Sequence, residues 1–203
     1  MGVKERKQRD REEMRETILK SAHQLFAGKG FEDVSIRNIA EAIEYSPATI
    51  YLYFKDKNEI FYALHGEAFK KFNEFLAPLA TIKDSFKRLI KMGEKYMEFA
   101  FQSPNYYDIM FIMQAPMDCD KNTEEWKEGE STLHGLENLV KECQKDGYFK
   151  GKDIQTLSFL IWSTMHGMCS LVLRDRMKIY EEKERGKMVE KSFKMFKQIL
   201  EQL

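Results

Sequence analysis

Apolar residues recur at helical spacing along almost the whole chain, and this periodicity constrains the fold more than any other feature of the sequence. No run alternates between apolar and polar residues for long enough to demand a β-sheet. The 203 residues include only 4 prolines, so few positions force a helix to break. The sequence therefore predicts an all-α protein with nine helices. They span approximately residues 10–27, 36–43, 46–54, 57–76, 82–102, 106–113, 123–145, 153–176 and 184–203.

The second, third and fourth predicted helices begin at recognisable caps. Ser35 and Ser46 suit the N-cap, because a serine hydroxyl accepts a hydrogen bond from a backbone N–H of the first turn, and Pro47 suits the first helical position. Asp56 and Glu59 have the spacing of a capping box. Two short helices joined by a tight turn, beside a longer first helix, predict a helix-turn-helix. Its core would consist of Ile36, Ile39, Ala40, Ile43, Ile50 and Phe54.

The formal net charge is zero, which counts mildly against nucleic-acid binding. The first eleven residues depart from this balance, because they hold two acids against the cations Lys4, Arg6, Lys7, Arg9 and Arg11. The sequence therefore predicts a basic arm before the first helix. A frayed and solvated N-terminus is the alternative interpretation of the same segment.

Neither export, a membrane span nor a metal site is expected. The charged N-terminus lacks the apolar segment of a secretory signal. The most apolar stretch, residues 157–173, is slightly too short and too polar to cross a membrane comfortably. Cys119, Cys143 and Cys169 are odd in number and widely spaced, so neither a disulfide framework nor a metal or cofactor site is predicted. A reducing cytoplasm fits this cysteine usage best.

Residues 31–61 closely resemble the tetracycline-repressor (TetR) family of transcriptional regulators. The matching stretches are Gly30–Phe31, Val34–Ala40, Ser46–Lys57 and Glu59–Phe61, and they cover about a quarter of the chain. The resemblance implies a nine-helix TetR-like architecture. A three-helix helix-turn-helix DNA-binding domain would occupy residues 1–55 with the arm, and a helical ligand-binding and dimerisation domain would occupy residues 56–203.

The resemblance also implies which residues bind DNA. The third helix would be the recognition helix, which enters the major groove. Groups near the bases would be Ser46, Pro47, Ala48 and Thr49. Groups near phosphates would be Ser35 and Arg37 at the start of the second helix, and Tyr51, Tyr53, Lys55 and Lys57. Packing of Tyr51 against the first helix is an alternative or additional role. The basic arm becomes a candidate to follow the DNA backbone or to enter the minor groove.

One position departs from the family pattern. The turn between the two short helices usually carries glycine where this chain has Glu44, and a small aliphatic residue where it has Tyr45. A non-glycine residue with positive φ costs roughly 1 kcal/mol. The turn is therefore expected to differ slightly in shape without changing the assignment.

The last two helices predict a homodimer. The final helix carries an apolar seam whose residues are spaced four, three, four and three positions apart in the sequence. They are Val189, Phe193, Phe196, Leu200 and Leu203. The preceding helix is apolar nearly all round, so the core of one domain covers only one of its faces. A partner subunit is the simplest cover for the other face, and a monomer core is the alternative. By resemblance these helices form a four-helix interface, and a dimer would match a palindromic operator.

Bulky and adaptable side chains between the fifth and eighth helices predict an apolar effector pocket, although ordinary core packing explains each of them singly. The expected ligand-binding residues are Tyr96, Phe99, Tyr107, Met110, Phe111, Trp126, Trp162, Met165 and His166. Trp162, His166 and Gly167 also resemble the WHG pattern that names one class of TetR-type C-terminal domains. His166 would be either a hydrogen-bonding group at the pocket or a core histidine that positions its helix.

Together these features predict a DNA-binding repressor that binds double-stranded operator DNA as a homodimer and is released by a small apolar or aromatic effector. The effector would act by shifting the fourth helix, which joins the two domains. Enzyme motifs such as HExxH, GxSxG and glycine-rich phosphate loops are absent, so no enzyme and no membrane partner are expected. The alternative is a helical adaptor or small-molecule-binding protein without sequence-specific DNA binding, which would leave the register of Ser46–Lys57 unexplained.

Overall fold

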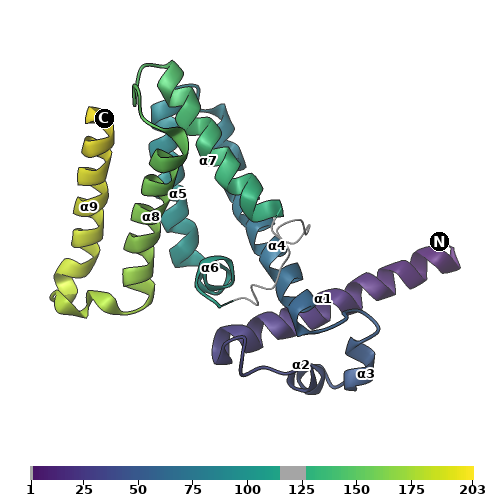
Figure 1. Cartoon of the computed structure of the whole chain (residues 1–203). Coiled ribbons are helices and arrows are strands. Elements are labelled where there is room, and N and C mark those ends of the chain that lie inside the picture. Colours follow the sequence, from purple (N-terminus) through teal and green to yellow (C-terminus); the bar gives the residue numbers. More distant parts are fainter. Residues whose placement is uncertain (1, 115–126) are drawn as a thin grey trace. The chain divides into compact units, whose positions relative to one another are not determined.

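The structure is a computed structural model that describes residues 2–114 and 127–203. These residues form nine α-helices and two 3₁₀-helices and contain no β-strand, which confirms the predicted all-α fold (Figure 1). In chain order the elements are α1 (Val3–Lys29), α2 (Ile36–Ala42), α3 (Pro47–Ile50), α4 (Lys57–Leu76), η1 (Ala77–Thr81), α5 (Ser85–Gln102), α6 (Pro104–Phe111), α7 (Lys127–Lys145), α8 (Ile154–Leu173), η3 (Arg176–Ile179) and α9 (Glu182–Gln202). The predicted loop at residues 117–123 and the predicted helix start at residue 123 lie outside the described residues.

The chain divides into two compact units. The N-terminal unit comprises Met1–Lys70 and Asn105–Glu128, and the C-terminal unit comprises Lys71–Pro104 and Gly129–Leu203. Helix α4 is continuous and contributes its first part to one unit and its last turns to the other. The compact units divide within α4, between Lys70 and Lys71, and not after residue 55. The predicted boundary after residue 55 concerns the division of functions, and it stays a prediction.

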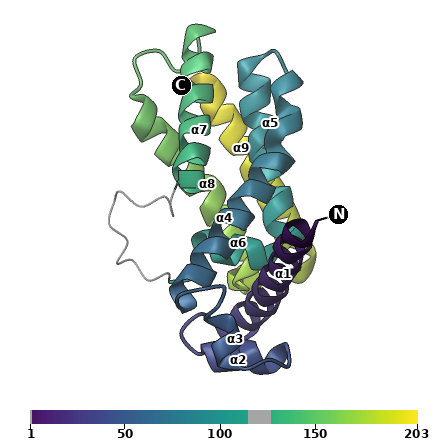
Figure 2. The same ribbon diagram turned by 90° about the vertical axis from the view of Figure 1, so that its right-hand side faces the viewer.

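In the N-terminal unit, α2 and α3 lie on one side of the long helix α1 (Figure 2). Four of the six predicted core residues are buried there and Ile36 and Ile43 are half-buried, because apolar positions of α1 recur one turn apart and meet those of the two short helices. Fully or nearly fully buried side chains are Ile18, Ala22, Phe26, Ile39, Ala40, Ile50 and Phe54. The rings of Phe26, Phe31 and Phe61 add an aromatic cluster, with Phe31 5.3 Å from Phe26 and 5.0 Å from Phe61.

Helix α1 begins at Val3, so the prediction of an arm that precedes the first helix was wrong. The basic residues lie within the first turns of a helix of 27 residues. Sequence periodicity missed this extension because the segment before Met14 has no apolar stripe, although its glutamates, lysines and arginines are all good helix formers. The helical geometry decides how these cations are presented.

The turn between α2 and α3 is a Schellman motif with glutamate at the left-handed position. Glu44 has φ 61°, the Tyr45 N–H donates to the Ala40 carbonyl at 2.9 Å, and the Glu44 N–H donates to the Glu41 carbonyl at 3.1 Å. Glu44 therefore occupies the left-handed position that glycine usually takes, at a cost of roughly 1 kcal/mol in backbone strain. The expected difference in turn shape stays a prediction.

His65 of α4 is buried in the N-terminal unit, only 2% exposed, with the rings of Phe61 and Phe69 at 6.3 and 4.8 Å. Burial lowers the pKa of His65 to about 4, and this effect exceeds the opposing influences of Glu128 and of a hydrogen bond to the Met110 backbone. The imidazole is therefore neutral in the folded protein near neutral pH.

The C-terminal unit packs α5 against α8 around a core of apolar side chains. Phe72, from the last turns of α4, lies 5.7 Å from the Tyr96 ring and 5.0 Å from the Phe99 ring. The other buried core residues include Phe86, Leu89, Leu136, Leu139, Val140, Phe149, Leu157, Ile161, Met165 and Cys169.

The predicted seam of α9 packs inside its own unit. Phe196 and Leu200 are 8% and 2% exposed within one chain, and a Cβ built on Gly93 of α5 would lie 3.1 Å from the ring of Phe193. Val189 and Phe193 are half-buried and Leu203 is 38% exposed, so the seam is covered only in part, and a dimer formed by the last two helices stays a prediction. The apolar residues that α9 leaves exposed are Met195 and Ile199, on an adjacent face.

Helix α8 has a length and composition that would suffice to cross a membrane, and 28% of its apolar window is buried. The contrary expectation considered only residues 157–173, whereas the helix has 20 residues from Ile154 to Leu173. Because its side toward α5 is buried, the uncovered apolar surface is confined to the opposite side.

Candidate functional site

The N-terminus of α3 presents small side chains outward. Ser46 is the N-cap, as predicted: its Oγ accepts a hydrogen bond from the Thr49 N–H at 3.3 Å and lies 3.1 Å from the Thr49 hydroxyl. Pro47 and Ala48 are exposed, and Thr49 is half-buried. The helix is shorter than predicted, ending at Ile50 with residues 51–53 in a turn. Its outward face can therefore approach another surface closely.

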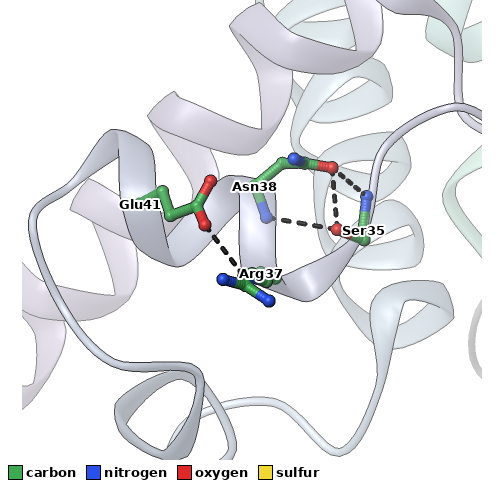
Figure 3. A network of polar contacts seen from close by, with 4 residues as sticks. All are labelled: Ser35, Arg37, Asn38 and Glu41. Atoms are coloured by element: carbon green, nitrogen blue, oxygen red, sulfur yellow. Dashed lines mark hydrogen bonds and ion pairs between the residues drawn. The ribbon is translucent and has the colours of Figure 1, made fainter.

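The start of α2 is held by a polar network of four side chains (Figure 3). Ser35 and Asn38 cap the helix reciprocally: the Asn38 N–H donates to Ser35 Oγ at 3.2 Å, and the Ser35 N–H donates to Asn38 Oδ1 at 2.9 Å. Arg37 Nε donates to Glu41 Oε1 at 2.9 Å, and both side chains are exposed. Sequence reasoning missed Asn38, although Asn at the third helical position after a serine is a variant of the capping box. A phosphate that binds Arg37 must compete with Glu41.

The end of α3 is anchored to α1 by Arg15, a residue that sequence reasoning missed. One terminal nitrogen of Arg15 donates to the Tyr53 carbonyl at 3.1 Å, and its guanidinium lies 4.1 Å from the centroid of the Phe54 ring. Tyr51 is 57% exposed, so it is not packed under α1 and its hydroxyl is free to reach a ligand. These contacts fix where the α3 turn lies on the N-terminal unit.

The two predicted lysines differ in their surroundings. Lys55 is exposed, and its backbone N–H donates to the Glu59 carboxylate at 2.5 Å. Lys57 is bound within the chain, because its ammonium donates a hydrogen bond to the Phe31 carbonyl at 2.7 Å and lies 4.1 Å from the centroid of the Phe31 ring. A phosphate contact from Lys57 stays a prediction, but the structure gives this side chain a bracing role.

The predicted effector residues fall into two groups. Tyr107, Met110 and Phe111 are in the N-terminal unit, where Phe111 lies 5.3 Å from Tyr107 and 5.6 Å from Phe69. The C-terminal unit holds Tyr96, Phe99, Trp162, Met165 and His166. Trp126 lies outside the described residues. That the two groups form one pocket stays a prediction.

His166 and Trp162 share a face of α8, with ring centroids 6.5 Å apart. Both side chains are half-buried, and burial lowers the pKa of His166 below its ordinary value. Gly167 has open space beyond it, since a Cβ there would meet nothing within 4 Å. The assignment to the WHG class stays a prediction.

Two cavities of the C-terminal unit are large enough for small molecules. One, of about 450 Å³, has an apolar floor that includes Met97, Phe101, Val189 and Phe193 and a rim that includes Lys178 and Arg185. The other, of about 420 Å³, is lined by residues of α4, η1, α5 and α7, including the ion-paired Arg88 and Glu142. Of the predicted ligand-binding residues that the structure describes, none lines either cavity, and no sequence pattern indicated the residues that do.

An exposed apolar surface follows α8 and α9 of the same unit. Phe159, Leu160 and Leu171 of α8 are 62%, 50% and 48% exposed, and Met195 and Ile199 of α9 are 63% and 49% exposed. On α8 these residues flank Ser163, Gly167 and Ser170 and lie opposite the buried side of the helix. Large apolar side chains left exposed along a helix face are typical of a protein–protein interface.

Comparison with known proteins agrees with this architecture. Residues 18–64 match the family described as bacterial regulatory proteins, tetR family. Residues 89–196, more than half of the chain, match the tetracyclin repressor-like C-terminal domain. An HTH-type transcriptional regulator of Staphylococcus aureus (strain bovine RF122 / ET3-1) is 32% identical over 95 residues, which cover 46% of this chain and 49% of that protein. The chain thus spans about half the length of this curated relative.

Two solved structures share the fold. The transcriptional regulator FadR of Bacillus subtilis, in complex with stearoyl-CoA, has a TM-score of 0.68 and 17% identity, over 88% of this chain and 95% of that one. AibR, in complex with isovaleryl coenzyme A and operator DNA, has a TM-score of 0.70 and 16% identity, over 89% and 96%. The two family matches, the helix-turn-helix geometry and this shared fold lead to one conclusion: the chain belongs to the tetR family of bacterial regulatory proteins.

Proposed function

We propose that this regulator is a dimeric repressor that reads a palindromic operator with α3 and leaves it when an apolar effector binds. The observation that carries the proposal is the exposed N-terminus of α3. Ser46 caps it, Arg15 fixes the turn that follows it, and its outward side chains are small or hydrogen-bonding. Such a helix fits a major groove about 12 Å wide.

The base contacts are assigned to Ala48 and Thr49, because an alanine or threonine methyl group can contact a thymine methyl and a threonine hydroxyl can bond a base edge. Tyr51, Tyr53 and Lys55 are assigned to phosphates that flank these bases. The Ser35 end of α2 provides a further phosphate site, where backbone N–H groups point outward. Phosphate contacts set the register of the protein on the duplex, and base contacts set the sequence preference.

The dimer is assigned to the exposed faces of α8 and α9. The α8 face centred on Ser163 and Gly167 combines large apolar residues with small ones, which lets a second helix approach closely. A second copy of the chain satisfies this face better than lipid does, since the opposite side of the same helix is packed in a folded core. A twofold dimer then presents two α3 helices to two half-sites about one helical turn apart.

The effector is assigned to compounds with an apolar acyl chain. Two proteins of the same fold were solved with stearoyl-CoA and isovaleryl coenzyme A, and the C-terminal unit of this chain contains two cavities of suitable volume, one of them with an apolar floor. Helix α4 is the continuous connection between the two units, so a shift of α4 is the simplest way to change the position of α3. The effector must bind the DNA-free conformation more tightly, because equal affinity for both states shifts nothing. The proposed action on DNA favours the cytoplasm as the place where the protein works.

The experiment measures the anisotropy of a labelled operator duplex, recovered by selection from a random library, against unlabelled competitor. We expect competitor-resistant binding, a large loss of sequence preference in Thr49→Ala, and release by a long-chain acyl-CoA but not by CoA alone. Salt-sensitive binding without sequence preference would instead favour the helical adaptor or ligand-binding alternative. Specific binding that no acyl compound releases would overturn the effector assignment alone.

A further inference from the structure

We propose that the first turns of α1 form a second DNA-binding surface, a cationic stripe of Lys4, Lys7 and Arg11 that binds phosphates outside the half-site read by α3. The stripe rests on the proposed function, because α3 must dock on DNA to bring α1 beside the backbone. It extends the DNA-binding surface beyond the helix-turn-helix.

The stripe continues the face of α1 that packs on the core. Ile18 and Ala22 are fully buried and stand one turn apart on that face. Going toward the N-terminus in steps of three or four residues, the same face carries Arg11, Lys7 and Lys4. The face is therefore apolar where it covers the core and cationic where α1 extends beyond it.

The opposite side of the same turns is neutralised within the helix. Arg6 lies 3.9 Å from Asp10, and Arg9 lies 3.8 Å from Asp10 and 3.5 Å from Glu13. Within residues 2–114 and 127–203, neither Lys7 nor Arg11 makes an ion pair. Asp10 and Glu13 are thus engaged by Arg6 and Arg9, which leaves the charges of Lys7 and Arg11 available to an external anion.

The stripe begins beside the turn that follows α3. Lys7, Asp10 and Arg11 line a shallow groove of about 370 Å³ together with Leu52 and Tyr53. Arg15, one turn after Arg11, donates to the Tyr53 carbonyl and holds the two elements together. Figure 1 shows the N-terminal turns of α1 projecting past α3 within this unit. A duplex bound by α3 therefore continues alongside the stripe.

The helical conformation selects phosphates as the ligand. An α-helix with its side chains is about 10 Å wide, too wide for a minor groove of about 6 Å, so the predicted minor-groove entry does not suit this segment. Lys4 and Arg11 are separated by about 10 Å along the helix axis, which equals the rise of about three nucleotides along the duplex axis at about 3.4 Å each. Long lysine and arginine side chains can adapt to that spacing.

The test compares Lys7→Ala/Arg11→Ala with the matched control Arg6→Ala/Arg9→Ala. Both remove two positive charges from the same turns, and alanine preserves the helix, which circular dichroism checks. The slope of log K against log salt should fall by about 0.9 for each phosphate that the protein no longer neutralises, so by about 1.8 per protomer for the stripe variant. The control should keep the wild-type slope.

Duplex length gives an independent readout. Removing the base pairs that flank the operator should weaken the wild type and the control equally, and leave the stripe variant unchanged. Equal slopes for the two double variants, or equal sensitivity to trimming, would overturn the stripe. Because phosphate contacts are independent of sequence, the slope difference is expected on random duplex too. A wild-type protein that binds DNA without sequence preference would refute the proposed function. The slope difference on random duplex would still show whether the stripe binds phosphates.

Discussion

Replacing Phe159 with alanine tests the dimer surface at its most exposed aromatic side chain. Phe159 is 62% exposed in the single chain. An aromatic side chain buries about 150–250 Å², so a partner would cover about 125 Å² of this ring. At about 25 cal/mol per Å² this is about 3 kcal/mol for each protomer, and about 6 kcal/mol for a twofold dimer that uses the surface twice. The dissociation constant should rise about 10⁴-fold.

Analytical ultracentrifugation across a concentration series measures this shift directly. The matched control is Ile179→Ala, since Ile179 of η3 is 83% exposed but lies outside the exposed faces of α8 and α9. We expect wild type and control to dimerise alike, and the Phe159 variant to dissociate at micromolar concentration and to lose operator affinity in parallel. A Phe159 variant that dimerises as tightly as the control would refute the assignment of this surface.

Three further predictions concern the N-terminal unit. Glu44 has φ 61°, so replacing it with glycine should leave the free energy of unfolding, measured by urea titration, unchanged or raise it by up to about 1 kcal/mol. Replacing it with valine should lower that free energy, because β-branched residues tolerate positive φ poorly. Arg15→Ala should lower that free energy by about 2 kcal/mol, because the variant cannot form the hydrogen bond to Tyr53 or stack on Phe54, and an unchanged urea midpoint would contradict this. Because the folded pKa of His65 is lowered to about 4, the unfolded chain binds a proton that the folded one does not below about pH 6.5. As the pH falls from 6.5 to 4, the free energy of unfolding of the wild type should therefore decrease by up to about 3 kcal/mol. The exposed-site control His134→Gln should show the same decrease, and His65→Gln should not.

Local chemistry made the helix-turn-helix predictable from sequence. Ser35, Ser46 and Pro47 act within one turn of the helix start, so their roles depend on neighbours a few residues away. The same holds for Glu44, whose position in the turn the motif register identified. The turn kept its usual hydrogen bonds because a Schellman motif needs a left-handed residue rather than glycine itself.

Features set by tertiary packing were harder to predict. The seam of α9 that includes Phe196 marks an apolar face, but periodicity alone does not say whether the surface it meets belongs to the same chain or to a partner. Gly93 accounts for one part of this packing, because the missing side chain leaves room for the ring of Phe193 in the same chain. Arg15 has no local signal either, since its partners Tyr53 and Phe54 lie 38 and 39 residues away. The two cavities arise from surfaces of several helices, so no single periodicity marks them.

The most direct test of the central claim is selection of duplexes from a random library by the purified protein, followed by sequencing of the bound fraction. We predict an inverted repeat whose half-sites are about one helical turn apart, with Thr49→Ala relaxing the preference at matching positions of both halves. Enrichment of a single, unrepeated sequence would contradict dimeric reading by α3. The absence of any enriched sequence would contradict operator recognition itself.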